Sequence, residues 1–218
     1  MSPGTRQVAF EAAASGPTLK GVLHLPTNDC GTGLPTRTFP AAVVCHPHTL
    51  MGGHMGNEFV VRVCLALAGA GWAALRFDFR GAGDSEGSFD KGKGEQDDVK
   101  GAVDFLLAQP EVDPDALAVI GYSFGAAVGL HHAARDQRLG RLVGIALVKH
   151  HYEDPFLDDD PRPKLFIAGG ADPWAPADAF ERYVSRLRSP KKLHVVPGGD
   201  HLFSGRVTEV ARVVVDWL

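Results

Sequence analysis

The sequence contains no uninterrupted apolar run near the roughly 18 residues that a membrane-spanning helix requires. Its beginning, residues 1–7, lacks the apolar core of a secretory signal peptide. Cysteine is scarce: Cys30, Cys45 and Cys64 are an odd number without CxxC spacing, which is typical of reduced thiols rather than of a disulfide framework. We therefore expect a cytoplasmic protein in which Cys45 and Cys64 are core residues.

An excess of positive charge is also missing. The chain has 22 Lys and Arg against 26 Asp and Glu, for a net charge of −4, and no basic run. Nucleic acids and anionic membranes are bound by clustered positive charge, so we expect neither as a partner. The hydrophobic content of 44% over 218 residues is that of an ordinary globular protein, and we predict a single domain over residues 1–218.

The chain alternates short apolar segments with helical ones. Strands are predicted at residues 8–13, 19–25, 41–45, 72–77, 117–122, 142–148, 164–168 and 193–196, and helices at residues 57–70, 94–107, 124–134, 177–187 and 207–218. This alternation predicts an α/β fold with a mostly parallel, doubly wound sheet of eight strands. A turn signal at residues 15–17 makes the opening pair antiparallel. The connection over residues 149–163 is too short to form a cap domain.

Residues 119–127 are an apolar run that passes through Gly121-x-Ser123-x-Gly125 into small residues. A serine on a sharp turn between strand and helix needs glycines around it, because Cβ atoms there would collide, and its hydroxyl stands free at the carboxyl edge of the sheet. Ser123 is therefore the candidate nucleophile. A simple N-cap role for this serine leaves both glycines unexplained.

A second match to the same pattern is Gly83-Asp84-Ser85-Glu86-Gly87. Here the serine lies between two carboxylates, which would oppose a developing oxyanion, and a charged glycine-rich loop follows where a packed helix should begin. Ser85 is accordingly disfavoured as the nucleophile.

Two polar residues follow later strands, at the edge where open parallel sheets bind ligands. Asp172 follows the strand at residues 164–168, and His201 follows the strand at residues 193–196. The chain order Ser, Asp, His is the one expected for a nucleophile on such a turn. A serine hydroxyl needs a base such as His201 to take its proton, and the histidine needs a carboxylate such as Asp172 to hold its tautomer.

Several alternatives compete with these assignments. Asp172 also fits an N-cap before Pro173, and Asp200, Asp154 or the acidic residues 158–160 could supply the carboxylate instead. The remaining histidines lie on a helix, as His131 and His132 do, or open the acidic connection, as His150 and His151 do. Among them, His201 alone combines a position after a strand with glycine-rich flanks.

The loop after the third strand contains His46-Pro47-His48. The His-x-His spacing fits a metal site, but the remainder of an HxHxDH zinc motif is absent. The other interpretation is an oxyanion loop, in which the backbone N–H of His48 or of a residue just after it pairs with the N–H of Phe124. We favour the second and expect neither a metal nor an organic cofactor.

Taken together, these motifs resemble the α/β-hydrolase superfamily, in particular its small lidless bacterial serine hydrolases related to dienelactone hydrolases. The resemblance spans nearly the whole chain and rests on residues 45–48 with Gly52-Gly53, and on residues 77–87, 121–125, 170–172 and 200–203. It implies Ser123, Asp172 and His201 as nucleophile, acid and base, and the N–H groups of His48 and Phe124 as oxyanion donors.

The chain departs from the pattern at Thr49, where relatives tend to carry proline. The nucleophile is serine rather than the cysteine of dienelactone hydrolases or the aspartate of haloalkane dehalogenases, which disfavours those chemistries. The resemblance also implies that the loop around Ser85 is structural.

We therefore predict a serine hydrolase that cleaves small carboxylic esters or thioesters through an acyl-enzyme on Ser123. A catalytically silent binding module of the same fold, or a peptidase or amidase with the same triad, are the alternatives. Because no cap covers the site, we expect an open, shallow apolar groove that prefers acyl chains of about two to eight carbons. The residues expected to line it are Leu50, Met51, Trp174 and Phe203.

Overall fold

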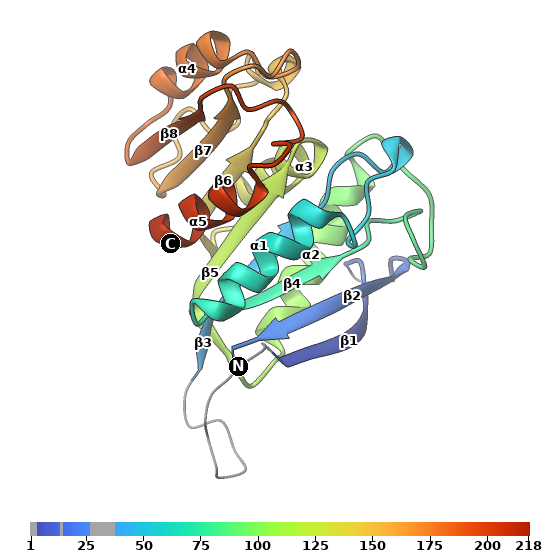
Figure 1. Ribbon diagram of the computed structural model, residues 1–218. Coiled ribbons are helices and arrows are strands. Elements are labelled where there is room, and N and C mark those ends of the chain that lie inside the picture. The colour runs from blue at the N-terminus through green and yellow to red at the C-terminus, as the bar shows by residue number, and fades with distance from the viewer. Residues whose placement is uncertain (1–3, 14, 27–37) are drawn as a thin grey trace.

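The computed structural model describes residues 4–13, 15–26 and 38–218, so that Cys30 lies outside the described part of the chain. Eight strands form one sheet: β1 (Gly4–Glu11), β2 (Thr18–Leu25), β3 (Phe39–Cys45), β4 (Ala73–Phe77), β5 (Val112–Tyr122), β6 (Leu139–Ile145), β7 (Lys164–Gly169) and β8 (Lys191–Val196). Their spatial order is β1-β2-β4-β3-β5-β6-β7-β8 (Figure 1). The predicted α/β class with eight strands is confirmed.

Strand β2 runs antiparallel to both of its neighbours, β1 and β4, whereas β3 through β8 pair in parallel. The opening antiparallel hairpin is thus as predicted. From β3 the chain first crosses to β4 on one side and then to β5 on the other. The strand order reverses there, and this reversal opens a crevice at the carboxyl ends of β3 and β5 where ligands bind in such sheets.

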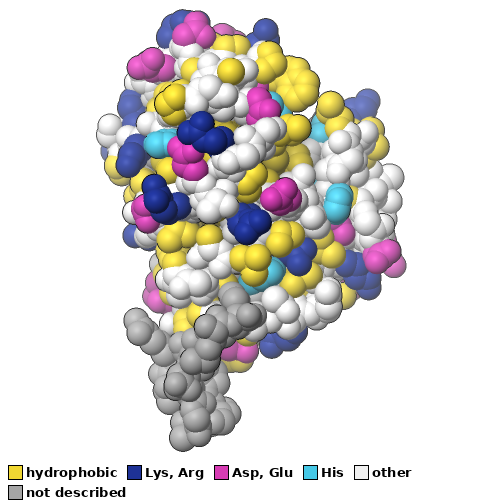
Figure 2. All heavy atoms as spheres, in the orientation of Figure 1, with side chains coloured by type: hydrophobic (Ala, Val, Ile, Leu, Met, Phe, Trp, Pro, Cys, Tyr) yellow, Lys and Arg dark blue, Asp and Glu magenta, His cyan; other side chains and the backbone are white. Residues whose placement is uncertain are grey.

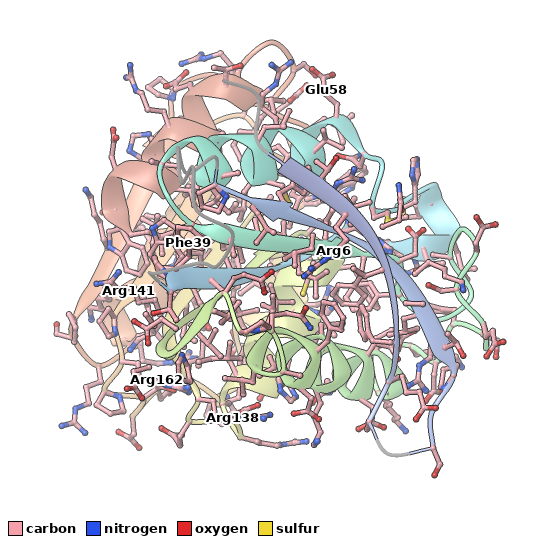
Figure 3. The ribbon with its side chains drawn as sticks, turned by 90° about the horizontal axis from the view of Figure 1, so that it is seen from below. Arg6, Phe39, Glu58, Arg138, Arg141 and Arg162 are labelled. Carbon is pink, nitrogen blue, oxygen red and sulfur yellow. The ribbon has the colours of Figure 1, made fainter. Side chains whose placement is uncertain are left out.

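Five helices cover the two faces of the sheet: α1 (Glu58–Gly69), α2 (Gly94–Leu107), α3 (Phe124–Ala133), α4 (Ala177–Arg186) and α5 (Val207–Trp217). Helices α1 and α5 pack on one face, and α2, α3 and α4 on the other, so that the sheet is enclosed between two helical layers (Figures 1 and 3). In the described residues, no helix is both long and apolar enough to span a lipid bilayer.

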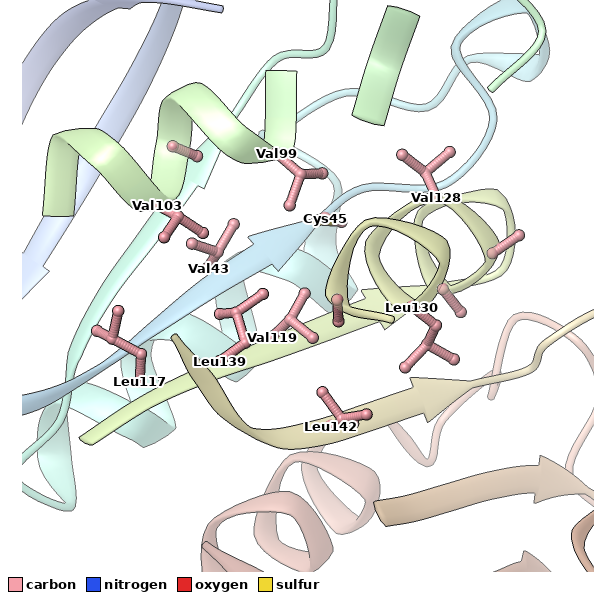
Figure 4. Packing of buried hydrophobic residues seen from close by; sticks show 14 of the residues in the cluster. Val43, Cys45, Val99, Val103, Leu117, Val119, Val128, Leu130, Leu139 and Leu142 are labelled. Atoms are coloured by element: carbon pink, nitrogen blue, oxygen red, sulfur yellow. The ribbon is translucent and has the colours of Figure 1, made fainter. Parts of the chain in front are cut away.

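Alternate residues of the strands supply the two cores, as the period of two in a strand requires. On β3, Val43 and Cys45 face α2 and α3, whereas Ala42 and Val44 face α1 and α5. Figure 4 shows the first of these cores, where the side chains of β3, β5 and β6 meet those of α2 and α3. Cys45 and Cys64 are both buried free thiols, as expected of core residues.

The face that α1 and α5 cover carries basic and acidic side chains interspersed among apolar ones (Figure 2). Basic side chains therefore do not gather into one patch on this face.

Several strand boundaries differ from the predicted ones, most of all in β1, predicted at residues 8–13 and observed at Gly4–Glu11, and two of the other differences have a clear cause. Strand β5 starts at Val112 rather than at Leu117, because Phe39 of β3 still pairs with it there. Strand β6 ends at Ile145, although the apolar run continues to Val148. At Ala146 the backbone turns to a φ of 49°, and its N–H donates to the carbonyl of Ile167. The last residues of the apolar run therefore lie in a buried turn that follows the strand.

The carboxyl end of α3 is fastened by Arg162, which Figure 3 labels together with Arg138. The buried Arg162 guanidinium donates to the carbonyls of Ala133, Asp136 and Leu139 at 2.7, 2.9 and 2.8 Å, and also to the carboxylate of Asp160. Carbonyls at the end of a helix have no partner within it, and the guanidinium supplies donors to the carbonyls that gather there.

The connection between β6 and β7 contains a short 3₁₀ helix, η2 (Lys149–His151), followed by turns. No α-helix occurs in this described segment, as its length predicted.

Candidate active site

Ser123 lies between the end of β5 and the start of α3, with φ 54° and ψ −116°. Such a conformation is strained for a residue with a side chain and typically costs about 1–3 kcal/mol. Its backbone N–H donates to the carbonyl of Ile145 at 2.8 Å, which ties the turn to β6. The strained turn therefore stands at the carboxyl edge of the sheet, as the sequence pattern predicts.

The two glycines of the motif are required by close backbone approach. A Cβ on Gly121 would lie 2.3 Å from the carbonyl oxygen of Gly125. A Cβ on Gly125 would lie 2.4 Å from the carbonyl oxygens of both Cys45 and His46. The first glycine allows α3 to begin directly over β5, and the second allows α3 to rest on the end of β3.

Ser123, His201 and Asp172 form a continuous row of hydrogen bonds. The hydroxyl oxygen of Ser123 is 2.9 Å from Nε2 of His201, and Nδ1 of His201 is 2.6 Å from Oδ2 of Asp172. The other oxygen of Asp172 accepts the backbone N–H groups of Trp174 and Ala175 at 2.8 and 3.0 Å. An ionised carboxylate can only accept, so the Nδ1 proton belongs to His201 and Nε2 is free to accept from Ser123.

The loops that carry Asp172 and His201 are bonded to each other. The N–H of Gly170 donates to the carbonyl of Val196, and the N–H of Ala171 donates to that of Gly199, both at 2.8 Å. The hydroxyl of Tyr122 donates to the carbonyl of His201 at 2.9 Å. These contacts hold the two post-strand loops in register with the turn at Ser123.

The competing residues have other partners. The carboxylate of Asp200 is exposed and binds the backbone N–H and the hydroxyl of Ser204 at 2.8 and 2.7 Å. Ser85 accepts the N–H of Lys20 at 2.9 Å and donates to the carbonyl of Asp78 at 2.7 Å. Ser85 thus closes its own loop against β2, away from the row.

His46 has both ring nitrogens committed within the fold. Its Nε2 accepts the N–H of Phe79 at 3.0 Å, so Nδ1 carries the proton and donates to the carbonyl of Pro47 at 2.6 Å. Burial lowers the pKa of His46 to about 4, with the nearby His54 adding to the effect and the Pro47 carbonyl opposing it. Neither nitrogen of His46 is available to a metal ion, which removes the His-x-His metal interpretation.

The loop after β3 brings His48 beside the start of α3. The rings of His48 and Phe124 lie 4.9 Å apart, and His48 accepts the N–H of Leu50 on Nδ1 at 3.2 Å. Among the described residues, the backbone N–H groups of His48 and Phe124 have no hydrogen-bond partner. Both residues line the same cavity as Ser123, and unpaired N–H groups are the kind of donor that an oxyanion requires.

A cavity of about 930 Å³ opens beside Ser123 and His201. Helix α3 supplies one wall through Phe124, Ala127, Val128 and His131, whose spacing places them on one face of the helix. The size is that of a small-molecule pocket.

Of the four residues expected to line a groove, Met51 and Trp174 do so, and Leu50 and Phe203 do not. Leu50 is 71% exposed because the short 3₁₀ helix η1 (Thr49–Met51) turns it outward. Phe203 is fully buried and packs against Tyr122, beneath His201. The ring of Trp174 lies 4.7 Å from that of His201.

Sequence reasoning missed the part of the cavity that follows β4 and β6. Phe89, Lys91 and Lys93 come from the segment leading into α2, Gln96 comes from the first turn of α2, and Lys149, His150 and His151 come from the connection after β6. Both segments follow carboxyl ends of strands, so the rule that located Asp172 and His201 also applies to them. The buried Glu95 fixes the first segment by accepting the N–H groups of Asp90 and Gly92 at 2.7 and 2.8 Å.

The charged groups that line the cavity are all basic. Lys91, Lys93 and Lys149 line it, and no carboxylate is among the described lining residues. Burial lowers the pKa of His131 and lowers that of His151 to about 4, an effect that Asp154 opposes for both. These two imidazoles are therefore neutral near pH 7.

Comparison with known proteins shows the family to which the chain belongs. Residues 11–157 match the family described as X-Pro dipeptidyl-peptidase (S15 family). An uncharacterized protein of Rickettsia prowazekii is 31% identical over 187 residues, which covers 82% of this chain and 78% of the relative.

Two solved structures have the same architecture. A lidless α/β serine hydrolase of Xanthomonas campestris has a TM-score of 0.82 and 31% identity over 96% of this chain and 91% of its own. A putative α/β hydrolase of Agrobacterium tumefaciens has a TM-score of 0.84 and 30% identity over 97% and 94%. The chain therefore belongs to the S15 family and is a small, lidless α/β serine hydrolase.

Proposed function

We propose that this protein hydrolyses small carboxylic esters or thioesters through an acyl-enzyme on Ser123. The observation that carries the proposal is the buried row Ser123–His201–Asp172, with bonds of 2.9 and 2.6 Å, that opens onto the cavity. A hydroxyl hydrogen-bonded to a neutral imidazole, itself oriented by a carboxylate, is the arrangement that activates serine as a nucleophile.

The first half of the reaction follows from this geometry. Oγ of Ser123 attacks the carbonyl carbon of the ester while its proton passes to Nε2 of His201. The carbonyl oxygen becomes an oxyanion and accepts the N–H groups of His48 and Phe124. Asp172 stabilises the imidazolium, which then protonates the departing alcohol or thiol as its bond to the acyl carbon breaks.

Water completes the cycle through the same groups. A water molecule gives a proton to Nε2 of His201 and attacks the acyl carbon, and collapse of the second oxyanion returns the proton to Ser123 and releases the carboxylic acid.

A dipeptidyl-peptidase activity, as the family description would suggest, is the second candidate and fits the cavity less well. Such an enzyme must bind the α-ammonium group of its substrate, which requires a carboxylate or comparable acceptors. The described lining residues include three lysines and no carboxylate, so a positively charged peptide terminus would be repelled.

Matched variants test the assignment. Ser123→Ala should lower kcat for p-nitrophenyl butyrate by at least about 10³-fold, and it should abolish labelling by a fluorophosphonate, because triad members act as a unit. Ser85→Ala is the control and should retain labelling. Labelling that survives in Ser123→Ala and is lost in Ser85→Ala would refute the proposal.

The same assay separates the two carboxylates. Asp172→Asn should lower kcat by up to about 10⁴-fold with little change in KM, because the histidine would adopt the wrong tautomer. Asp200→Asn should change kcat far less, since its partner is Ser204. Glycyl-proline p-nitroanilide serves as the peptidase substrate, and faster turnover of it than of p-nitrophenyl butyrate would favour the peptidase instead.

A further inference from the structure

Three side chains of ligand type meet at the wall of the cavity, outside the Ser123 row. His131 comes from α3, His151 from η2, and Asp154 from the turn that follows η2. One ligand atom from each lies within 4.8 Å of the others, and Nε2 of His131 is 3.2 Å from Oδ2 of Asp154. From this cluster we propose a binding site for one zinc ion, formed by His131, His151 and Asp154.

The distances fit a four-coordinate ion. With bonds of about 2.0–2.1 Å to nitrogen and oxygen, tetrahedral ligand atoms lie roughly 3.3 Å apart. The ligand atoms of His131 and Asp154 already have this spacing. The ligand atom of His151 lies at most 4.8 Å from each of them, and a side-chain rotation brings it to the same spacing.

Local packing holds the ligands near one another. The ring of Phe156 stacks on that of His131 at 3.8 Å and 16°, and the rings of His131 and His151 meet edge to face at 5.7 Å. The N–H of Asp154 donates to the carbonyl of His151 at 3.3 Å, which closes a turn between these two ligands.

The donor set selects the class of ion. Two imidazole nitrogens and one carboxylate oxygen suit Zn²⁺ and similar borderline cations, whereas Mg²⁺ and Ca²⁺ prefer sites made of oxygen. Three protein ligands leave one coordination position of a zinc ion open. Because His131 and His151 both line the cavity, that position faces the space in which a substrate would lie.

The site is separate from the serine chemistry. His131 follows Ser123 by eight residues on α3, which corresponds to about 12 Å along the helix axis. An ion there is too distant to polarise a carbonyl bonded to Ser123. Its role would be to bind the far end of a ligand in the cavity, and its presence does not depend on Ser123 being the nucleophile.

Isothermal titration calorimetry of the chelator-treated full-length protein with zinc chloride tests the proposal. We expect one zinc per chain, with His151→Gln and Asp154→Asn each weakening binding at least about tenfold. Glu153→Gln is the matched control, because Glu153 is exposed between His151 and Asp154 and lies outside both the ligand cluster and the cavity lining, and its affinity should stay within about twofold. Ser123→Ala should bind as the wild type does, so failure of the proposed hydrolysis would leave this result intact.

Thermal unfolding gives an independent readout. Zinc should raise the Tm of the wild type and of Glu153→Gln, and it should raise that of Asp154→Asn much less, because only a folded site binds the ion. Zinc-free melting curves show whether each variant is folded. Absence of stoichiometric binding by the wild type, unchanged affinity in both ligand variants, or equal loss in Glu153→Gln would overturn the proposal.

Discussion

The buried His46 makes the stability of this protein depend on pH in a calculable way. The histidine is fully buried, accepts the N–H of Phe79 on Nε2, and has its pKa lowered by burial to about 4. In the unfolded chain its pKa is about 6.5. Between these values the unfolded chain binds a proton that the native state does not, so the free energy of unfolding is highest above pH 6.5 and falls as the pH drops toward 4.

The size of the effect follows from the difference of about 2.5 pKa units, which corresponds to about 3 kcal/mol over the whole window. A protonated Nε2 would also face the N–H of Phe79, donor against donor, and would detach the loop that carries His48 from β4. We therefore expect the site to loosen in the same pH window.

Urea unfolding of the wild type and of His46→Gln between pH 4.5 and 7.5 measures this contribution. Glutamine can accept the Phe79 N–H but does not titrate, so the variant should be less stable at pH 7.5 and should lose about 2–3 kcal/mol less than the wild type on acidification. Other histidines of lowered pKa, such as His24, affect both proteins equally. Parallel pH profiles for the two proteins would refute the reasoning.

Three further predictions follow from the packing around α3. Gly125→Ala should lower both the free energy of unfolding and kcat, because its Cβ overlaps the carbonyls of Cys45 and His46. Denaturation and ester assays measure both effects, and Gly140→Ala is the comparison, because the nearest contact of its Cβ is at 3.7 Å. Arg162→Met should lower the free energy of unfolding by about 3 kcal/mol, since it removes the guanidinium that pairs with the buried carboxylate of Asp160 and donates to three carbonyls. A change under about 1 kcal/mol in urea unfolding would contradict it. In a series of p-nitrophenyl esters, kcat/KM should rise with acyl length to about eight carbons and then fall, as the apolar stripe of Phe124, Ala127 and Val128 is filled; a rise that continues into long, emulsified esters would show that the cavity does not limit the chain.

The fold and the row of three residues could be predicted because both rest on patterns local to the chain. Strands that are buried on both faces read as short apolar runs, and Ser123, Asp172 and His201 each follow such a run directly. Once the strands are parallel, their carboxyl ends meet at one edge, and the three side chains are brought together by topology alone.

The wall of the cavity could not be predicted in the same way, because it depends on where single side chains point within loops. Phe203 has a φ of 51°, and its ring is buried in the core against Phe59 and Tyr122 and does not line the cavity. The cluster at His131 joins a helix to a connection some 20 residues later, and no spacing in the sequence links them. The spacing His46-Pro47-His48 is the metal-type pattern that is visible in the sequence, but both ring nitrogens of His46 are hydrogen-bonded within the fold.

The basic border of the cavity has a consequence for the end of the catalytic cycle. Hydrolysis of a neutral ester creates a carboxylate beside Lys91, Lys93 and Lys149. The acid product is therefore attracted to the cavity more strongly than the ester that gave rise to it. Release of the product, rather than cleavage, should then limit turnover at low ionic strength, and added salt should speed the enzyme by screening the lysines. The free acid should act as a competitive inhibitor whose strength declines as salt is added.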